Sequence, residues 1–136
     1  MVRAMTWTRA GAFAQVGVRL RNNQWSWSGR SEDGQTVAIT VWTDKVKRED
    51  DSFVYRQIAY TEAERGRPGF RELIENLRWA RDHCGGLVKI VMTTAKDDKA
   101  NPREVERCYP VTDQRRLQLV DVDYETGAHV AKMVTV

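Results

Sequence analysis

Residues 68–95 read PGFRELIENLRWARDHCGGLVKIVMTTA, and this stretch holds the clearest helix and the clearest strand of the chain. Pro68 suits the first position of a helix and Gly85-Gly86 suits its end, so the spacing predicts a helix over residues 68–83. Apolar side chains recur every three or four residues and predict its buried face: Phe70, Leu73, Ile74, Leu77, Ala80 and Cys84. Residues 87–95 are nearly all apolar or β-branched, which indicates an interior strand.

The other side of this predicted helix carries mostly polar residues: Glu72, Glu75, Asn76, Trp79 and His83. We expect this side to face away from the core. A tryptophan in such a position either contacts another part of the fold or binds a partner.

Residues 22–44, NNQWSWSGRSEDGQTVAITVWTD, hold three of the five tryptophans. Asp33-Gly34 is a strong signal for a two-residue hairpin loop. That loop would place Trp27 opposite Thr40 and Trp25 opposite Trp42, with all three rings on one face. The other face alternates serine with aliphatic residues, so the sequence leaves open whether the rings form a core or a binding surface.

The remaining segments add shorter elements. Residues 8–20 predict a helix with Thr8 as its N-cap, and residues 53–60 alternate as a strand does, after a charged connection over residues 45–51. Asn101, Pro102 and Glu104 predict the start of a short helix. One strand is expected before residues 125–127 and another after them.

This order of elements predicts one α+β domain over residues 1–136. We expect a curved, mainly antiparallel sheet or a small open β-barrel, with one long helix and one or two short helices. Only one β-α-β unit is visible, which disfavours a doubly wound nucleotide-binding fold.

Composition restricts the class of protein. The chain has 136 residues, of which 41% are hydrophobic and 30% charged, as is typical of a globular domain. No apolar run approaches the ~20 residues that cross a bilayer, so we expect a cytoplasmic protein without membrane contacts. Two cysteines and two histidines are too few for a disulfide framework or a four-ligand zinc site, and we expect no cofactor and no metal.

The formal charge of +3 is unevenly distributed. Residues 1–30 contain five arginines and no acidic residue, whereas the rest of the chain holds 17 basic and 19 acidic residues, a formal charge of −2. Arginines interleaved with tryptophans suit a nucleic-acid surface, since cations bind phosphate and indole rings stack on bases. A solvated basic face without a ligand is the other interpretation.

Catalytic motifs are scarce. The sequence has no phosphate-binding loop, no nucleophile elbow and no zinc-protease motif. Asp97-Asp98-Lys99 resembles the D-x-K element of metal-dependent nucleases, but the acidic partner that such a site needs cannot be identified. The sequence therefore favours a binding role over an enzymatic one.

Five consecutive motifs, WSWSG, VWTD, RELIENLRWA, LVKIVMTTAKD and ANPRE, carry a resemblance over residues 20–107. The pattern resembles a bacterial reader-type domain associated with modification-dependent restriction and HNH-type endonuclease proteins. With two histidines the chain has no HNH nuclease module, so the resemblance implies only contact with DNA. The residues that it implies are Trp25, Trp27, Trp42, Asp44, Lys96, Asp97 and Arg103.

The sequence thus predicts a small DNA-binding reader domain that recognises a modified or flipped base. The base would stack on Trp25 or Trp27, and Asp44 or Asp97 would accept a hydrogen bond from it. The arginines expected to hold phosphates are Arg19, Arg21, Arg30 and Arg103.

Two alternatives remain open. One is a protein-interaction module, such as an immunity, inhibitor or accessory protein, that uses Trp79 and the acidic helix face. The other is a Mg-dependent nuclease that uses Asp97 and nearby acids.

Overall fold

The computed structural model describes residues 7–100 and 103–136. In chain order the elements are α1 (Arg9–Gln15), β1 (Ser28–Arg30), β2 (Val37–Trp42), the 3-10 turn η1 (Thr43–Lys45), β3 (Val46–Glu49), β4 (Ser52–Gln57), α2 (Glu62–Arg65), α3 (Pro68–His83), β5 (Leu87–Ala95), β6 (Val105–Pro110), β7 (Arg115–Val122) and β8 (His129–Thr135).

Within the described residues, eight strands form one sheet in the order β1-β2-β5-β7-β8-β4-β3, with β6 also paired to β5. The pairing of β2 with β5 is parallel and the others are antiparallel. One edge of β5 is shared, because Leu87 and Val88 pair with β7 whereas Val91–Ala95 pair with β6. The sheet divides at this point and curves without closing. The predicted α+β class with a mainly antiparallel, open sheet is confirmed.

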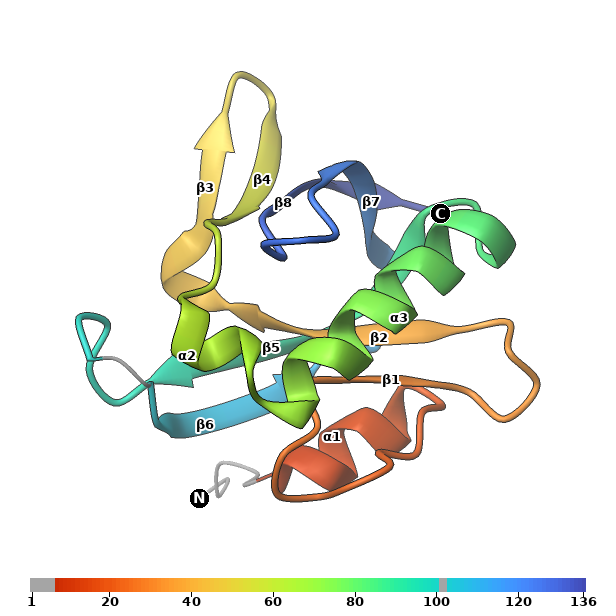
Figure 1. Ribbon diagram of the computed structural model, residues 1–136. Helices are drawn as coiled ribbons and strands as arrows, with labels where there is room; N and C mark the ends of the chain where they lie inside the picture. Colours follow the sequence, from red (N-terminus) through yellow and green to blue (C-terminus); the bar gives the residue numbers. More distant parts are fainter. Residues whose placement is uncertain (1–6, 101–102) are drawn as a thin grey trace, which may run out of the picture.

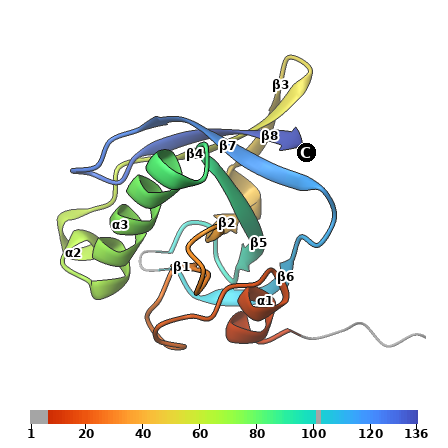
Figure 2. The same cartoon turned by 90° about the vertical axis from the view of Figure 1, so that its right-hand side faces the viewer.

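Two apolar cores lie on the two faces of the sheet. The larger packs α3 against Ile39, Ile90 and Leu117, and the smaller packs α1 against Ala38 and Val91. Figure 1 shows α3 crossing the sheet and the β3–β4 hairpin projecting from the body. In Figure 2 the two helices α3 and α1 lie on different sides of β2 and β5. No helix in the described ranges is long and apolar enough to span a membrane.

Helix α3 and strand β5 have the predicted bounds. Gly85 and Gly86 follow the helix with φ of 64° and 77°, a left-handed conformation that glycine adopts without strain. The predicted polar side of α3 is wrong in part, because Glu72 and Asn76 are buried. Asn76 donates a hydrogen bond to Ser28 Oγ at 2.9 Å, so this side of the helix packs against β1.

We call residues 22–44 the tryptophan hairpin. It has the predicted register only near its turn. Ser28 pairs with Ile39, and the backbone N–H of Thr40 donates to the carbonyl of Trp27 at 3.1 Å. The predicted pairing of Trp25 with Trp42 is wrong. Residues 22–26 form a turn, in which Asn22 Oδ1 accepts from the backbone N–H of Trp25 at 3.2 Å. Trp42 instead pairs with Thr93 in β5.

Three shorter predictions also differ from the structure. Helix α1 is capped by Thr8 as expected but ends at Gln15, before Gly17 at φ 88°. The charged connection contains β3, which forms a hairpin with β4. Residues 103–104 are coil and β6 follows them, so the predicted short helix is wrong there. Asn101 and Pro102 lie outside the described residues.

Candidate functional site

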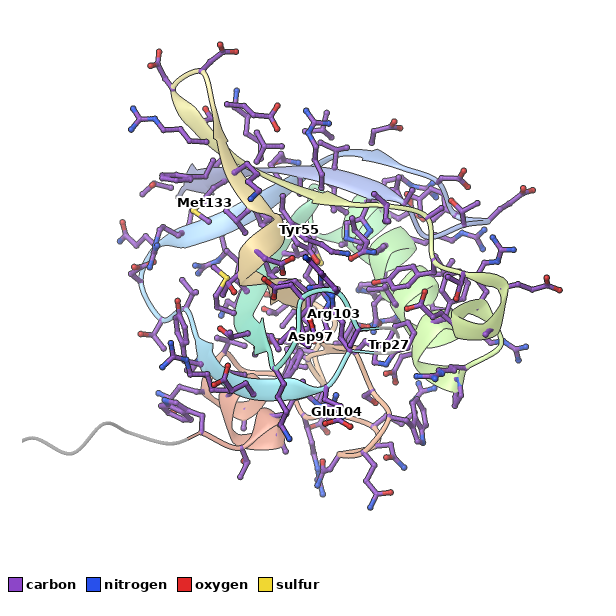
Figure 3. All side chains as sticks on the ribbon, turned by 90° about the vertical axis from the view of Figure 1, so that its left-hand side faces the viewer. Trp27, Tyr55, Asp97, Arg103, Glu104 and Met133 are labelled. Atoms are coloured by element: carbon purple, nitrogen blue, oxygen red, sulfur yellow. The ribbon has the colours of Figure 1, made fainter. Side chains whose placement is uncertain are left out.

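A cavity of about 330 Å³ opens where β2, β4, β8 and the start of α3 meet. Its volume is within the range of roughly 300–1,000 Å³ that is usual for small-molecule sites. We call it the aromatic cavity; the residues that matter below are Trp27, Trp42, Lys45, Tyr60, Arg103 and His129. Figure 3 looks onto this part of the molecule and labels Trp27 and Arg103 near its centre.

Trp27 and Tyr60 form one wall of the aromatic cavity. Their rings stack with centroids 5.4 Å apart and an interplanar angle of 26°. Tyr60 in turn meets Phe70 edge-on at 5.6 Å. A Cβ atom at Gly69 would lie 2.7 Å from Trp27 Nε1, so the absence of a side chain there lets the indole sit against the first turn of α3. This wall is therefore held by packing between two coil segments and the first turn of α3.

Trp42 and Arg103 contribute a second part of the lining. The Arg103 guanidinium lies over the Trp42 ring, 5.1 Å from its centroid. It donates to both carboxylate oxygens of Asp44, at 2.7 and 2.8 Å, and to the backbone carbonyl of Asp98 at 2.8 Å. The hydrogen bonds from Arg103 hold the pKa of Asp44 below its usual range.

The structure thus brings three predicted residues, Trp42, Asp44 and Arg103, together. Asp44 and Arg103 neutralise each other, so neither is free to hold a base edge or a phosphate without breaking a bidentate ion pair.

The polar part of the cavity was not predicted. Lys45 Nζ donates to Gln57 Oε1 at 3.2 Å, and Gln57 pairs with His129 across β4 and β8, which places both side chains on one face of the sheet. The His129 ring lies 2.8 Å from the carbonyl of Gly127 through Nδ1. Burial lowers the pKa of His129, and the charge of Lys45 lowers it further.

Nothing in the sequence marks these polar residues as a group. Lys45, Gln57 and His129 come from separate segments, and only the β4–β8 register brings them together. The one available signal is that His129 begins a predicted strand of otherwise mostly apolar residues, and this signal does not distinguish a ligand-binding histidine from a structural one.

A second hollow of about 380 Å³ adjoins the first. It is lined by Trp25, by Glu72 and Glu75, and by four arginines, and we call it the arginine groove: Arg21, Arg65, Arg67 and Arg71. Arg67 lines both the arginine groove and the aromatic cavity. Arg21 lies 3.7 Å from the buried carboxylate of Glu72, while its own side chain is 72% exposed.

Other predicted site residues lie elsewhere. Arg19 is exposed beside a third hollow that shares only Arg21 with the arginine groove. The Arg30 guanidinium lies 4.0 Å from the centroid of the Trp79 ring, and it lines neither the aromatic cavity nor the arginine groove. The expectation that Arg30 and the hairpin tryptophans share one groove is therefore wrong for the described residues.

Two predicted residues of the segment after β5, Lys96 and Asp97, do not line the aromatic cavity, whereas their neighbour Asp98 does. Lys96 forms an ion pair with Glu104 at 3.5 Å, and Asp97 Oδ1 accepts a hydrogen bond from the backbone N–H of Lys99 at 2.9 Å. In the part of the chain that the structure describes, no three His, Cys, Asp or Glu side chains gather as metal ligands would.

Trp79 is engaged within the fold. Its indole N–H donates to the carbonyl of Gly34 at 2.7 Å, and its ring contacts His83 with centroids 3.9 Å apart. These contacts join α3 to the turn of the tryptophan hairpin.

Comparisons of this chain with family models, with curated proteins and with solved structures found no match. The function is therefore inferred from the aromatic cavity and the arginine groove themselves.

Proposed function

We propose that this chain is a small DNA-binding reader domain, which holds an extruded base in the aromatic cavity and backbone phosphates in the arginine groove. The observation that carries the proposal is Arg67, which lines both hollows. A nucleotide has a flat ring and an anionic phosphate joined by a sugar, so its binding site needs an aromatic surface and a cationic surface side by side.

The energetics require both parts. Extrusion of a base from a duplex costs a few kcal/mol, and stacking on an aromatic side chain returns about 1–3 kcal/mol. The aromatic cavity alone therefore gives little net affinity. Phosphate contacts supply most of the affinity of DNA-binding proteins, and the four arginines of the groove outnumber its two glutamates.

The same proposal includes recognition of a modified base, which the resemblance of residues 20–107 to reader-type domains supports. A cavity that encloses the whole base can contact its ring faces and its Watson–Crick edge together with any ring substituent, whereas the grooves of an intact duplex expose only the outer edges. Duplexes that carry a modified or an unmodified base at one position would show this preference as a difference in affinity.

Fluorescence anisotropy with two labelled duplexes tests the core of the proposal. One duplex is fully paired and the other has a central mismatch, which lowers the cost of extrusion. We expect tighter binding to the mismatched duplex and about tenfold weaker binding by Trp27→Ala, because the stacking surface is lost. Tyr109→Ala is the matched control, since Tyr109 is 45% exposed on β6 and lines neither hollow.

Equal binding by the wild type and Trp27→Ala would contradict the role of the aromatic cavity. Absence of binding to either duplex at low salt would overturn the whole proposal and favour the protein-interaction alternative. Trp79 gives that alternative little support, because its indole N–H is already bonded to Gly34.

A further inference from the structure

One buried nitrogen in the aromatic cavity lacks a partner. His129 is 3% exposed and lines the cavity. A carbonyl oxygen only accepts hydrogen bonds, so the 2.8 Å contact with Gly127 means that Nδ1 carries the ring proton. The neutral ring then has a lone pair on Nε2, and among the described residues Nε2 has no hydrogen-bond partner.

An unpaired buried acceptor is rare in native proteins. Nε2 is also closed off from solvent, so a ligand in the cavity that moves a donor up to it gains a hydrogen bond that water does not supply. The ring of His129 therefore favours a ligand that places an N–H or O–H group against Nε2.

Lys45, which also lines the aromatic cavity, offers hydrogen-bond donors where His129 offers an acceptor. Its ammonium has three N–H donors, of which one is bonded to Gln57 Oε1. Gln57 itself is occupied, because the same oxygen lies 3.5 Å from the Tyr55 hydroxyl and Nε2 donates to the carbonyl of Ile58 at 2.9 Å. The polar part of the cavity thus holds an acceptor on His129 and a donor on Lys45, which is bonded to Gln57, the cross-strand neighbour of His129.

We propose that His129 and Lys45 select the base by its Watson–Crick edge, and that the ligand class is a base whose Watson–Crick edge has an amino group beside a ring-nitrogen acceptor, namely adenine or cytosine. This inference rests on the proposed function. The amino group donates to His129 Nε2 and the neighbouring ring nitrogen accepts from Lys45 Nζ.

Guanine and thymine fit less well. Each has a carbonyl oxygen where adenine and cytosine have the amino group, so two lone pairs would face each other at His129. In an intact duplex the edge that His129 and Lys45 would contact is occupied by the partner strand. Selection by these residues therefore needs an extruded or unpaired base.

Short single-stranded oligonucleotides test this selection, with abasic spacers at every position except one central base. The central base is adenine, purine without the amino group, cytosine, the pyrimidinone ring that is cytosine without its amino group, or thymine. For the wild type we expect removal of the amino group to weaken binding about tenfold. The thymine probe should bind no better than the rings without an amino group.

Variants assign the effect to each residue. In His129→Leu the probes with and without the amino group should bind with about equal affinity. His129→Gln keeps an acceptor and should retain part of the preference. Lys45→Met should weaken the adenine and purine probes by the same factor, because both keep the ring nitrogen. Trp27→Ala should weaken all the probes.

Equal wild-type affinity for adenine and purine, and for cytosine and its stripped ring, would overturn the selection. The proposed function would survive that result if Trp27→Ala still weakened every probe, and it would fail with the selection if no probe and no duplex bound. Preferential binding of thymine would also contradict the inference. The wild-type ratios decide the question even if His129→Leu does not fold.

Discussion

The ring of His129 illustrates how burial and one hydrogen bond set the chemistry of a side chain. Nδ1 is held by the carbonyl of Gly127, and the lowered pKa keeps the ring neutral. The same features have a consequence for stability that does not depend on any ligand.

Acidification should destabilise the fold through His129. The folded pKa lies below the ordinary value of about 6.5, so the unfolded chain takes up the proton first as pH falls. The contribution of His129 is fully present above that value and is lost as pH falls toward the folded pKa, by at most about 1.4 kcal/mol per pH unit. Urea unfolding at several pH values measures the slope of the free energy of unfolding against pH. This slope should be present in the wild type and absent in His129→Leu. An unchanged slope in the variant would contradict it.

Gly69 should not tolerate a side chain. A Cβ there would meet the carbonyl oxygen of Trp25 and the Trp27 ring, so Gly69→Ala should lower the free energy of unfolding by about 1–3 kcal/mol. Gly66→Ala is the matched control, because Gly66 has φ −77° and its nearest neighbour would lie at an ordinary 3.5 Å. That control should be neutral or stabilising by about 0.4–1 kcal/mol. Similar losses of unfolding free energy in both variants would argue against the described packing of Trp27 on Gly69.

At the scale of elements, local signals and long-range pairing had different predictive value. Helix α3 and strand β5 begin and end where Pro68, Gly85 and the apolar run indicate, since these signals act within a few residues. Residues 105–110 form β6 and not the predicted helix because they pair with the open edge of β5, the preceding strand, and this pairing outweighs the local helix-start signal. Strand β3 was missed because its charged residues pair only with β4.

The ion pair of Asp44 and Arg103 joins η1 to the segment that follows β5, and it should couple these elements energetically. A double-mutant cycle with Asp44→Ala and Arg103→Ala should give a coupling of about 1–2 kcal/mol, since the pair is bidentate and three-quarters shielded from solvent. Glu49 and Arg56 form a matched bidentate pair that is more exposed, and its cycle should give a smaller coupling. Equal couplings would show that burial contributes nothing to the Asp44–Arg103 pair.

For the whole molecule, the distribution of charge along the chain differs from its distribution in space. Of the arginines that the structure describes within the acid-free first 30 residues, only Arg21 lines the arginine groove, and the other three arginines of the groove come from residues 65–71. Most of the arginines that gather in this groove therefore differ from those that the sequence suggested, Arg21 being common to both. Trp25 is the one predicted aromatic residue that lies in this groove.

Salt dependence should identify the groove in solution. If Arg67 and Arg71 each neutralise one phosphate, Arg67→Ala and Arg71→Ala should each lower the log-log salt slope of duplex binding by about 0.9. Arg48→Ala on β3 is the control, because Arg48 is exposed and lines neither hollow. Anisotropy titrations at several salt concentrations give the slopes. Equal slopes in all the variants would exclude the groove as the phosphate site.

The amino-acid sequence by itself determined the elements whose signals are local: the start of α1 at its Thr8 cap, helix α3, the apolar strand β5, the register of the hairpin that turns near Gly34, and the α+β class that follows from their order. The tertiary structure alone decided the site. Trp27, Lys45, Arg67 and His129 come from separate elements, and the register of β4 with β8 and the close approach at Gly69 set their distances. Such placements result from the packing of the whole chain, and no window of neighbouring residues encodes them.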